Sequence, residues 1–330
     1  MPMTGKTSYQ GAAPGLKGKT ISDAVPPACL LSEIRALLPD QKLATGKDMD
    51  VYLASAQQIP QTLQEIGRLR EITFRAVGEG TGKAVDIDRF DRFYLHLFLW
   101  DHHNHRIAGA YRLGLTDKIL NRHGKLGLYS QSLFELHDRF LDTLSPAIEL
   151  GRSFVAHQYQ KTIAPLALLW KAIGCFIARN PQYATLFGPV SISNNYCPLS
   201  RQLLVDFFDN NNPDDPLRKF VKARHPYRPE AQPRCNRPDL ATPASFKELS
   251  ELIAAIEKDG KAVPVLLRHY VNFGGRILGF SVDKKFANCL DGLVLVELCQ
   301  TDERILGRYM GNEGLARFKQ YHARTLALTA

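Results

Sequence analysis

The sequence has few cysteines, and none of them are spaced as in zinc or redox sites. Its six cysteines are scattered over 330 residues without a C-x-x-C pair. This usage fits a reducing compartment, so we expect a cytoplasmic protein. Long hydrophobic runs are missing too, because the longest apolar stretch, residues 163–178, contains Lys171 and is too short to cross a bilayer. Residues 1–20 contain no apolar segment of the kind found in signal peptides.

A complete phosphate-binding loop is also absent. A Walker loop requires G-x-x-x-x-G-K-[ST], because its backbone amides must surround the phosphates. The segment GEGTGKAVDIDRFD, residues 78–91, fails this test twice. Val77 stands where the first glycine belongs, and Ala84 follows Gly82 and Lys83. We therefore expect these glycines to serve another purpose.

The net charge of +9 predicts attraction to an acidic partner. Nucleic acid, an anionic membrane surface and an acidic carrier protein are three such partners. Much of the charge lies in residues 217–238, and a solvated basic connector explains this segment equally well. No zinc-finger or RNA-recognition motif accompanies it, so we expect no nucleic-acid partner.

Hydrophobic periodicity predicts one folded domain over residues 46–330, with a basic, proline-rich insertion at 213–240. Residues 1–45 are expected to form a partly disordered tail that carries one short helix. Strands are predicted at 48–55, 92–101, 106–115, 147–156, 185–193, 276–283 and 290–298. Helices are predicted at 59–77, 132–144, 164–180, 198–210, 245–258, 264–273 and the C-terminus.

This order of elements predicts an α/β (α+β) fold whose mixed central sheet begins antiparallel and becomes parallel in the middle. The order resembles the GNAT acyltransferase fold. In that fold two middle strands splay apart and admit a pantetheine arm, and helices flank the sheet.

The strand AIELGRSFV, residues 147–155, contains a carboxylate at the centre of an apolar run. Burying the carboxylate of Glu149 is costly unless it has a partner or a chemical task. Two explanations stay open, a structural ion pair with a basic neighbour and a catalytic role.

Several long motifs resemble the ornithine-lipid N-acyltransferases, some of which are labelled haemolysins. These motifs are LREITFRAVGEGTGKAVDIDRFDRFYLHLFLWD, AIELGRSFV, LLWKAIGCFIARNP, LFGPVSISNNYCPLSRQLLVDFF and LLRHYVNFGGRILGFSVDKKFANCLDGLVLVEL. The resemblance covers residues 48 to 330. A more distant likeness, to the acyl-homoserine-lactone synthases, rests on Arg70, Asp88, Asp91, Arg112, Glu149 and Arg152.

The resemblance implies transfer of a fatty acyl group, often 3-hydroxylated, from acyl carrier protein to the α-amino group of an amino acid. Ornithine is the acceptor typical of the family, and the product would be a lyso-aminolipid. The donor would be the acyl-phosphopantetheine of the carrier, with no permanently bound cofactor and no metal. The segment HQYQKTIAPLALL lacks the glycines that hold the CoA pyrophosphate in acetyl-CoA enzymes, which favours the carrier over CoA. Peripheral contact with an anionic inner membrane is a second use for the basic surface.

The resemblance also implies roles for individual residues. Glu149 would be the general base, and Tyr196 would return a proton to the thiolate. The expected substrate-binding residues are Arg70, Asp88, Asp91, Arg112, Arg152, Ser191 and Asn194. The expected donor-binding residues are Phe154, Val155, Gln160 and Lys161. Segment 78–91 would be a mobile wall of the substrate entrance. Its Asp88 and Asp91 would either attract the acceptor's ammonium group or pair with Arg70 and Arg112, and the sequence does not separate these two roles.

Other functions are less well supported by the sequence. A lysophospholipid O-acyltransferase would use N-H-x-x-x-x-D, and the two H-x-x-x-x-D matches at 96–101 and 137–142 lack the asparagine. The cluster DHHNH, residues 101–105, is typical of a solvated hairpin turn rather than a metal site. A non-enzymatic carrier-binding, lipid-binding or haemolysin-like protein would have no need of Glu149 as a base.

Overall fold

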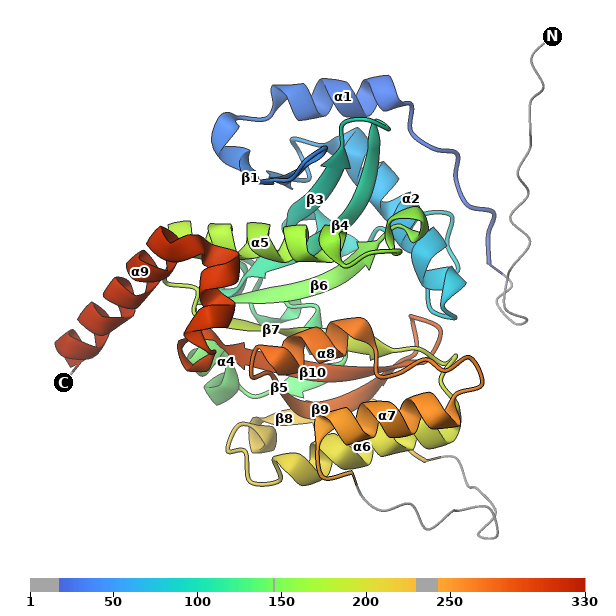
Figure 1. Ribbon diagram of the computed structural model, residues 1–330, viewed down its shortest axis with the longest axis vertical. Coiled ribbons are helices and arrows are strands. Elements are labelled where there is room, and N and C mark those ends of the chain that lie inside the picture. The colour runs from blue at the N-terminus through green and yellow to red at the C-terminus, as the bar shows by residue number, and fades with distance from the viewer. Residues whose placement is uncertain (1–17, 145, 230–242, 330) are drawn as a thin grey trace.

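The fold is built on one large sheet with helices on both faces (Figure 1). The computed structural model describes residues 18–144, 146–229 and 243–329. In sheet order the strands are β1 Lys42–Thr45, β2 Met49–Ser55, β3 Leu95–Asp101, β4 Arg106–Leu115, β6 Ala147–Val155, β7 Thr185–Ile192, β10 Cys289–Glu297 and β9 Arg276–Asp283. Two short strands, β5 Phe134–Leu136 and β8 Val221–Ala223, pair beside it.

The helices bury the apolar side chains of both faces of the sheet. They are α1 Pro27–Ala36, α2 Pro60–Ala76, α3 Thr116–His123, α4 Asp138–Leu144, α5 Ala164–Arg179, α6 Pro198–Asn211, α7 Phe246–Ile256, α8 Val265–Asn272 and α9 Glu303–Thr329. Helices α5 to α9 contribute to the largest core, α1 and α2 to a second, and α4 with β5 to a third. Helix α5 packs against β1 to β4 and against α9.

The sheet is antiparallel except at its centre, where β6 runs parallel to β7. Their pairing covers only Ala147–Glu149 against Thr185–Phe187. Beyond Glu149 the backbone of β6 bulges, with Arg152 at a φ of 49°, and its register against β4 shifts. The two strands therefore part halfway along their length. The expected mixed sheet with splayed middle strands is confirmed.

Gly188 sets the close approach of β7 to β6 at the point where the strands part. Its φ is 150°, and a Cβ there would overlap the carbonyl oxygen of Leu150. We expect Gly188→Ala to lower the free energy of unfolding by about 3 kcal/mol, through backbone strain and overpacking. Chemical denaturation measures the loss. Gly151→Ala is the control, because a Cβ at Gly151 meets nothing within 4 Å. Equal stability of the two variants would contradict this explanation.

Two segments differ from the sequence-based prediction. Folded structure begins before residue 46, because Leu30 and Ile34 of α1 are buried and β1 forms the edge of the sheet. Residues 1–17 lie outside the described part. The helix expected over 132–144 is a strand followed by a helix. Phe134 and Leu136 are buried on alternate positions of β5, and this period of two competes with helix.

The described part of the basic insertion predicted at 213–240 contains a strand and a bridge. Its strand β8 pairs with β5, and Pro226 forms a bridge to Ser281 in β9. Residues 230–242 lie outside the described part. None of the described helices is long and apolar enough to cross a membrane.

Candidate active site

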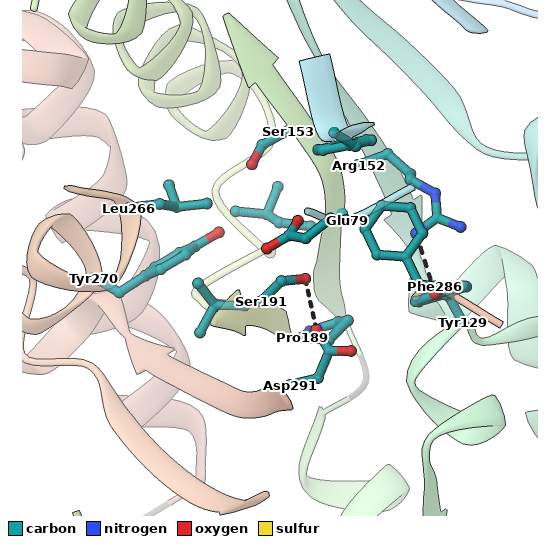
Figure 2. Close-up of a pocket in the computed structure, with 14 residues that line it drawn as sticks. Glu79, Tyr129, Arg152, Ser153, Pro189, Ser191, Leu266, Tyr270, Phe286 and Asp291 are labelled. Atoms are coloured by element: carbon teal, nitrogen blue, oxygen red, sulfur yellow. Dashed lines mark hydrogen bonds between the residues drawn. The ribbon is translucent and has the colours of Figure 1, made fainter. Parts of the chain in front are cut away.

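A cavity of about 110 Å³ opens where β6 and β7 part. Figure 2 shows the side chains that line it. Arg152 and Ser153 come from β6 and Ser191 from β7, while Asp291 comes from β10 and Glu79 from the loop after α2. Charged and hydroxyl groups thus converge at the gap in the sheet, as expected of a ligand site.

A second, more apolar pocket of about 440 Å³ lies next to this cavity and shares Ser153 and Leu266 with it. All four expected donor-binding residues line this second pocket: Phe154, Val155, Gln160 and Lys161. A third hollow, of about 760 Å³, shares residues 161–163 with the second pocket. Four cationic side chains line it: Lys47, Lys161, Lys171 and Arg308. The three hollows thus adjoin one another through shared lining residues, from the groove with these four cations (the basic groove), through the apolar pocket, to the small polar cavity.

The glycine-rich loop after α2 carries Glu79 into the cavity. Gly78 and Gly80 have φ values of 75° and 109°, which non-glycine residues rarely adopt. The carboxylate of Glu71 holds the loop by accepting hydrogen bonds from the backbone amides of Thr81, at 3.0 Å, and Gly82, at 2.8 Å. Segment 78–91 was expected to line the substrate entrance. Of this segment, Glu79 lines the cavity.

The two carboxyl groups in the cavity are buried and influence each other. Burial, with a contribution from the negative charge of Asp291, raises the pKa of Glu79 to about 8, although Arg152 acts to lower it. Burial also raises the pKa of Asp291 to about 7, with a contribution from Asp283. The hydroxyl of Ser191 donates to Asp291 at 2.8 Å. Such acids titrate near neutral pH, as groups that exchange protons in catalysis often do.

Arg152 provides the positive charge on the cavity wall. Its Nε lies 3.1 Å from an oxygen of Asp86, and its Nη1 donates to the hydroxyl of Tyr129 at 3.1 Å. Burial acts to lower the pKa of Arg152, but Asp86 and Tyr129 outweigh it and keep the pKa well above its ordinary value. The guanidinium therefore stays charged beside the cavity.

The structure favours one of the two roles left open for Asp88 and Asp91. Asp91 pairs with Arg70 at 2.7 Å and with Arg112 at 3.3 Å. Asp88 pairs with Arg112 at 2.7 Å. Neither acid lines the cavity. These four residues form a buried ion-pair cluster that fixes segment 88–91 against α2 and β4.

Glu149 does not line the cavity either. Its carboxylate is 1% exposed and accepts hydrogen bonds from the Tyr94 hydroxyl and from the backbone amides of Tyr129, at 3.1 Å, and Ser130, at 2.5 Å. These contacts give Glu149 a positioning role. It fixes the backbone at Tyr129, whose side chain reaches Arg152.

Two further predicted residues lie away from the cavity. The Tyr196 hydroxyl donates to the carbonyl of Ala262 at 2.6 Å, and the Asn194 amide donates to the carbonyl of Ala287 at 2.6 Å. Both contacts join the β7–α6 loop to neighbouring segments. Of the expected substrate-binding residues, the structure brings Arg152 and Ser191 to the cavity.

Glu79 and Asp291 were not among the site residues predicted from the sequence, although the sequence around each of them has a feature that could have indicated a site. Glu79 stands between two glycines, a pattern that exposes one side chain on a tight loop. Asp291 lies in the apolar strand CLDGLVLVE. The cost of burying a carboxylate, which singled out Glu149, applies equally to Asp291.

The histidine motifs form no second site in the described residues. His96 is buried and contacts the carbonyl of Asp91 at 2.8 Å, rather than Asp101. Asp101 caps the hairpin turn by accepting the backbone amides of His103 and Asn104, each at 2.9 Å. No group of three possible metal ligands occurs among the described residues.

Comparisons with known proteins show what the chain is similar to. Residues 69–171 match the family described as an acetyltransferase (GNAT) domain. Solved structures of a CoA-dependent acyl-homoserine lactone synthase and of the synthase LasI are similar to the chain. The first has 12% identity, a TM-score of 0.38 and coverage of 82% of this chain and 98% of that chain. The second has 13% identity, a TM-score of 0.31 and coverage of 49% of this chain and 79% of that chain. These two structural similarities are too weak to carry an argument.

Two curated relatives are more informative, and both are named glycine N(alpha)-acyltransferase. The protein from Phocaeicola vulgatus is 31% identical over 261 residues, which span 75% of this chain and 79% of the relative. The protein from Bacteroides thetaiotaomicron is 30% identical over 280 residues, which span 80% of this chain and 82% of the relative. The chain therefore belongs to the N-acyltransferase family that contains these proteins.

Proposed function

We propose that the protein transfers a fatty acyl group from the phosphopantetheine thioester of an acyl carrier protein to the α-amino group of an amino acid. The observation that carries this proposal is the meeting of an apolar pocket and a small polar cavity at Ser153 and Leu266. A thioester entering through the apolar pocket would reach an amine held in the cavity. Holding both reactants at this junction lowers the entropic part of the barrier.

The parted strands also offer groups that stabilise charge in the transition state. Beyond Glu149, β6 has no ladder partner on its β7 side. Backbone amides on that edge would donate to the thioester oxygen as it becomes negative. The C–N bond forms as the C–S bond breaks, and the carrier thiol leaves through the apolar pocket.

The basic groove supports an acidic carrier as the donor. Lys161 and Lys171 lie at the groove and are exposed. Positive patches steer acidic partners and raise their association rate. We propose the cytoplasm as the site of this reaction, on the basis of cysteine usage, with peripheral contact to an anionic membrane as the alternative.

Reversing the charge of the basic groove tests whether acyl carrier protein docks there. We expect Lys161→Glu combined with Lys171→Glu to raise the KM for acyl carrier protein about tenfold at low salt, because attraction becomes repulsion. The KM for the amino acid should not change. Steady-state kinetics at two salt concentrations measures both. Lys247→Glu on α7 is the control, since Lys247 is exposed and does not line the groove. An unchanged KM for the carrier in the double variant would remove the support for this docking face.

Two acceptors are proposed for different reasons. Glycine is the acceptor in the names of both relatives, and the small cavity suits the smallest amino acid. Ornithine is the acceptor that the sequence motifs imply, and two carboxyl groups in one cavity would balance its second ammonium group.

The test is a thiol-release assay with 3-hydroxyacyl carrier protein against a panel of amino acids that includes glycine and ornithine. We expect amino-acid-dependent release of the carrier thiol, and a product whose mass equals the acceptor plus one acyl group minus one hydrogen. The acceptor with the highest kcat/KM identifies the substrate. If no amino acid accelerates release, the proposed function is wrong, and a carrier- or lipid-binding role takes its place.

A further inference from the structure

Glu79 is a buried carboxylate with no hydrogen-bond partner for its side chain in the described part of the structure. The residue is only 6% exposed. Figure 2 shows its carboxylate directed into the middle of the cavity, among Tyr270, Ser191 and Phe286. A buried acid without a partner destabilises the fold, so it is retained at a cost. The position of this group therefore indicates a ligand that carries hydrogen-bond donors.

Asp291 lies on the opposite side of the same cavity, on β10. Unlike Glu79, it has partners in the protein, the hydroxyl of Ser191 at 2.8 Å and the thiol of Cys289 at 3.6 Å. Its negative charge acts on Glu79 across the cavity. A cationic ligand between the two would relieve this repulsion.

We propose that Glu79 and Asp291 form the binding site for the amino group of the acceptor, and that Glu79 takes the proton which that amine must lose. This inference rests on the proposed function and assigns residues to it. Arg152 lines the same cavity, and although its Nε pairs with Asp86 at 3.1 Å, its guanidinium is the cation that would bind the acceptor's carboxylate. The cavity then complements both charges of an amino acid.

The proton balance is complete without any further reactant. The bound ammonium gives one proton to the carboxylate of Glu79 and becomes a nucleophilic amine. Its nitrogen forms the C–N bond to the thioester carbon, and the C–S bond breaks. The second proton of the amine passes to the leaving sulfur, which departs as a thiol. Glu79 then returns its proton to solvent, so one proton is released in each turnover.

The electrostatics of the cavity suits this role. An acid whose pKa is about 8 is a strong enough base to deprotonate an ammonium group held beside it. The titratable or charged groups around Glu79 are Asp291, Arg152, Tyr129, Tyr196, Tyr270 and Cys289. Burial raises the pKa values of the three tyrosines and of Cys289, so these four stay neutral near pH 8. The pH response near neutrality therefore belongs to the Glu79–Asp291 pair.

The same pKa shift has a consequence for stability. Because the pKa of Glu79 is raised in the folded state, the folded protein binds more protons than the unfolded chain between about pH 4.3 and pH 8. Stability should therefore fall as the pH rises through this window. Replacing Glu79 by glutamine should remove this loss of stability at higher pH.

The experiment uses Glu79→Gln with Glu71→Gln as the matched control on the same loop. For Glu79→Gln we expect kcat/KM for the amino acid to fall about a hundredfold with the KM for the carrier unchanged. We also expect its Tm at pH 8 to exceed that of the wild type by a few degrees, with a smaller difference at pH 5. Glu71→Gln should lose stability at both pH values, because the Glu71 carboxylate is hydrogen-bonded to the loop.

The outcomes separate this inference from the proposed function. If the wild type acylates an amino acid and Glu79→Gln stays within threefold of it, the inference is wrong and the proposed function stands. If the wild type acylates no amino acid, the proposed function is wrong. Thermal shifts with glycine and ornithine then test the site alone, and equal shifts in wild type and Glu79→Gln would overturn it. Asp291→Asn should weaken the same ligand-induced shift.

Discussion

Replacing Arg112 by methionine should lower the free energy of unfolding by about 3–5 kcal/mol, because it removes one side of a buried charge cluster. The Arg112 side chain is 0% exposed and pairs with Asp88 and Asp91. Its guanidinium also lies 5.1 Å from the ring centre of Tyr94 and 5.3 Å from that of Tyr129. Methionine would fill part of the volume, but it would remove the 2.7 Å ion pair of Asp88 and leave Asp91 paired with Arg70.

Chemical denaturation of Arg112→Met and of Arg89→Met tests this claim. The Arg89 guanidinium lies 4.7 Å from the Phe90 ring, but the residue is exposed, so its loss should cost less than about 1 kcal/mol. Adding Asp88→Asn to Arg112→Met should restore part of the stability, since it removes the negative charge that Arg112 balances at 2.7 Å. If Arg112→Met lowers the free energy of unfolding by less than about 1 kcal/mol, the ion-pair cluster does not hold segment 88–91 in place.

The cluster also predicts how stability responds to acid. Burial acts to raise the pKa of Asp91, but Arg70 and Arg112 outweigh it and hold the pKa well below its usual value. A depressed carboxyl pKa contributes stability that is present above the unfolded-state pKa of about 3.9 and is lost as the pH falls below it. Arg112→Met should therefore lose less stability than the wild type between pH 5 and pH 2.

Closing the junction between the two pockets should abolish transfer. Leu266 lies in the first turn of α8 and lines both the apolar pocket and the polar cavity. We expect Leu266→Trp to reduce the rate of acyl transfer about a thousandfold or more, because the two reactants can no longer meet. Single-turnover kinetics with preformed acyl carrier protein measures this rate directly.

A control on the same helix separates obstruction from misfolding. Arg268 is exposed on α8 and lines neither pocket, so Arg268→Trp should retain transfer within a few-fold. Leu266→Ala should also retain activity, since it widens the junction. Normal turnover by Leu266→Trp would mean that the acyl group reaches the amine by another route.

Local patterns in the sequence were sufficient to predict most of the fold. The strand 147–155 could be located because its apolar run is bounded by clear breaks, and the parting of β6 from β7 followed from the resemblance to a known fold. The strand β1 and the pairing of β5 with β8 could not be found. These strands are three or four residues long, and they depend on contacts with distant parts of the chain.

The site was harder to predict than the fold. Sequence reasoning identified Arg152 and Ser191, which do line the cavity, but it gave most weight to Glu149. A buried acid in a strand is costly wherever it occurs, and the sequence does not show whether its partners are ligands or the protein itself. In Glu149 the partners are two backbone amides and a tyrosine, whereas Glu79 has none among the described residues. That difference depends on tertiary structure.

The donor and the amino acid are proposed to meet at the gap between β6 and β7, and the affinity for a bisubstrate analogue tests this. A bisubstrate analogue would join pantetheine, through a stable linker in place of the thioester, to the nitrogen of the accepted amino acid. The account predicts that the analogue binds at least about a hundredfold more tightly than either half alone, since both ends are then held together. The Leu266→Trp variant should bind the analogue no more tightly than its pantetheine half. An analogue that binds no more tightly than its pantetheine half would contradict the account.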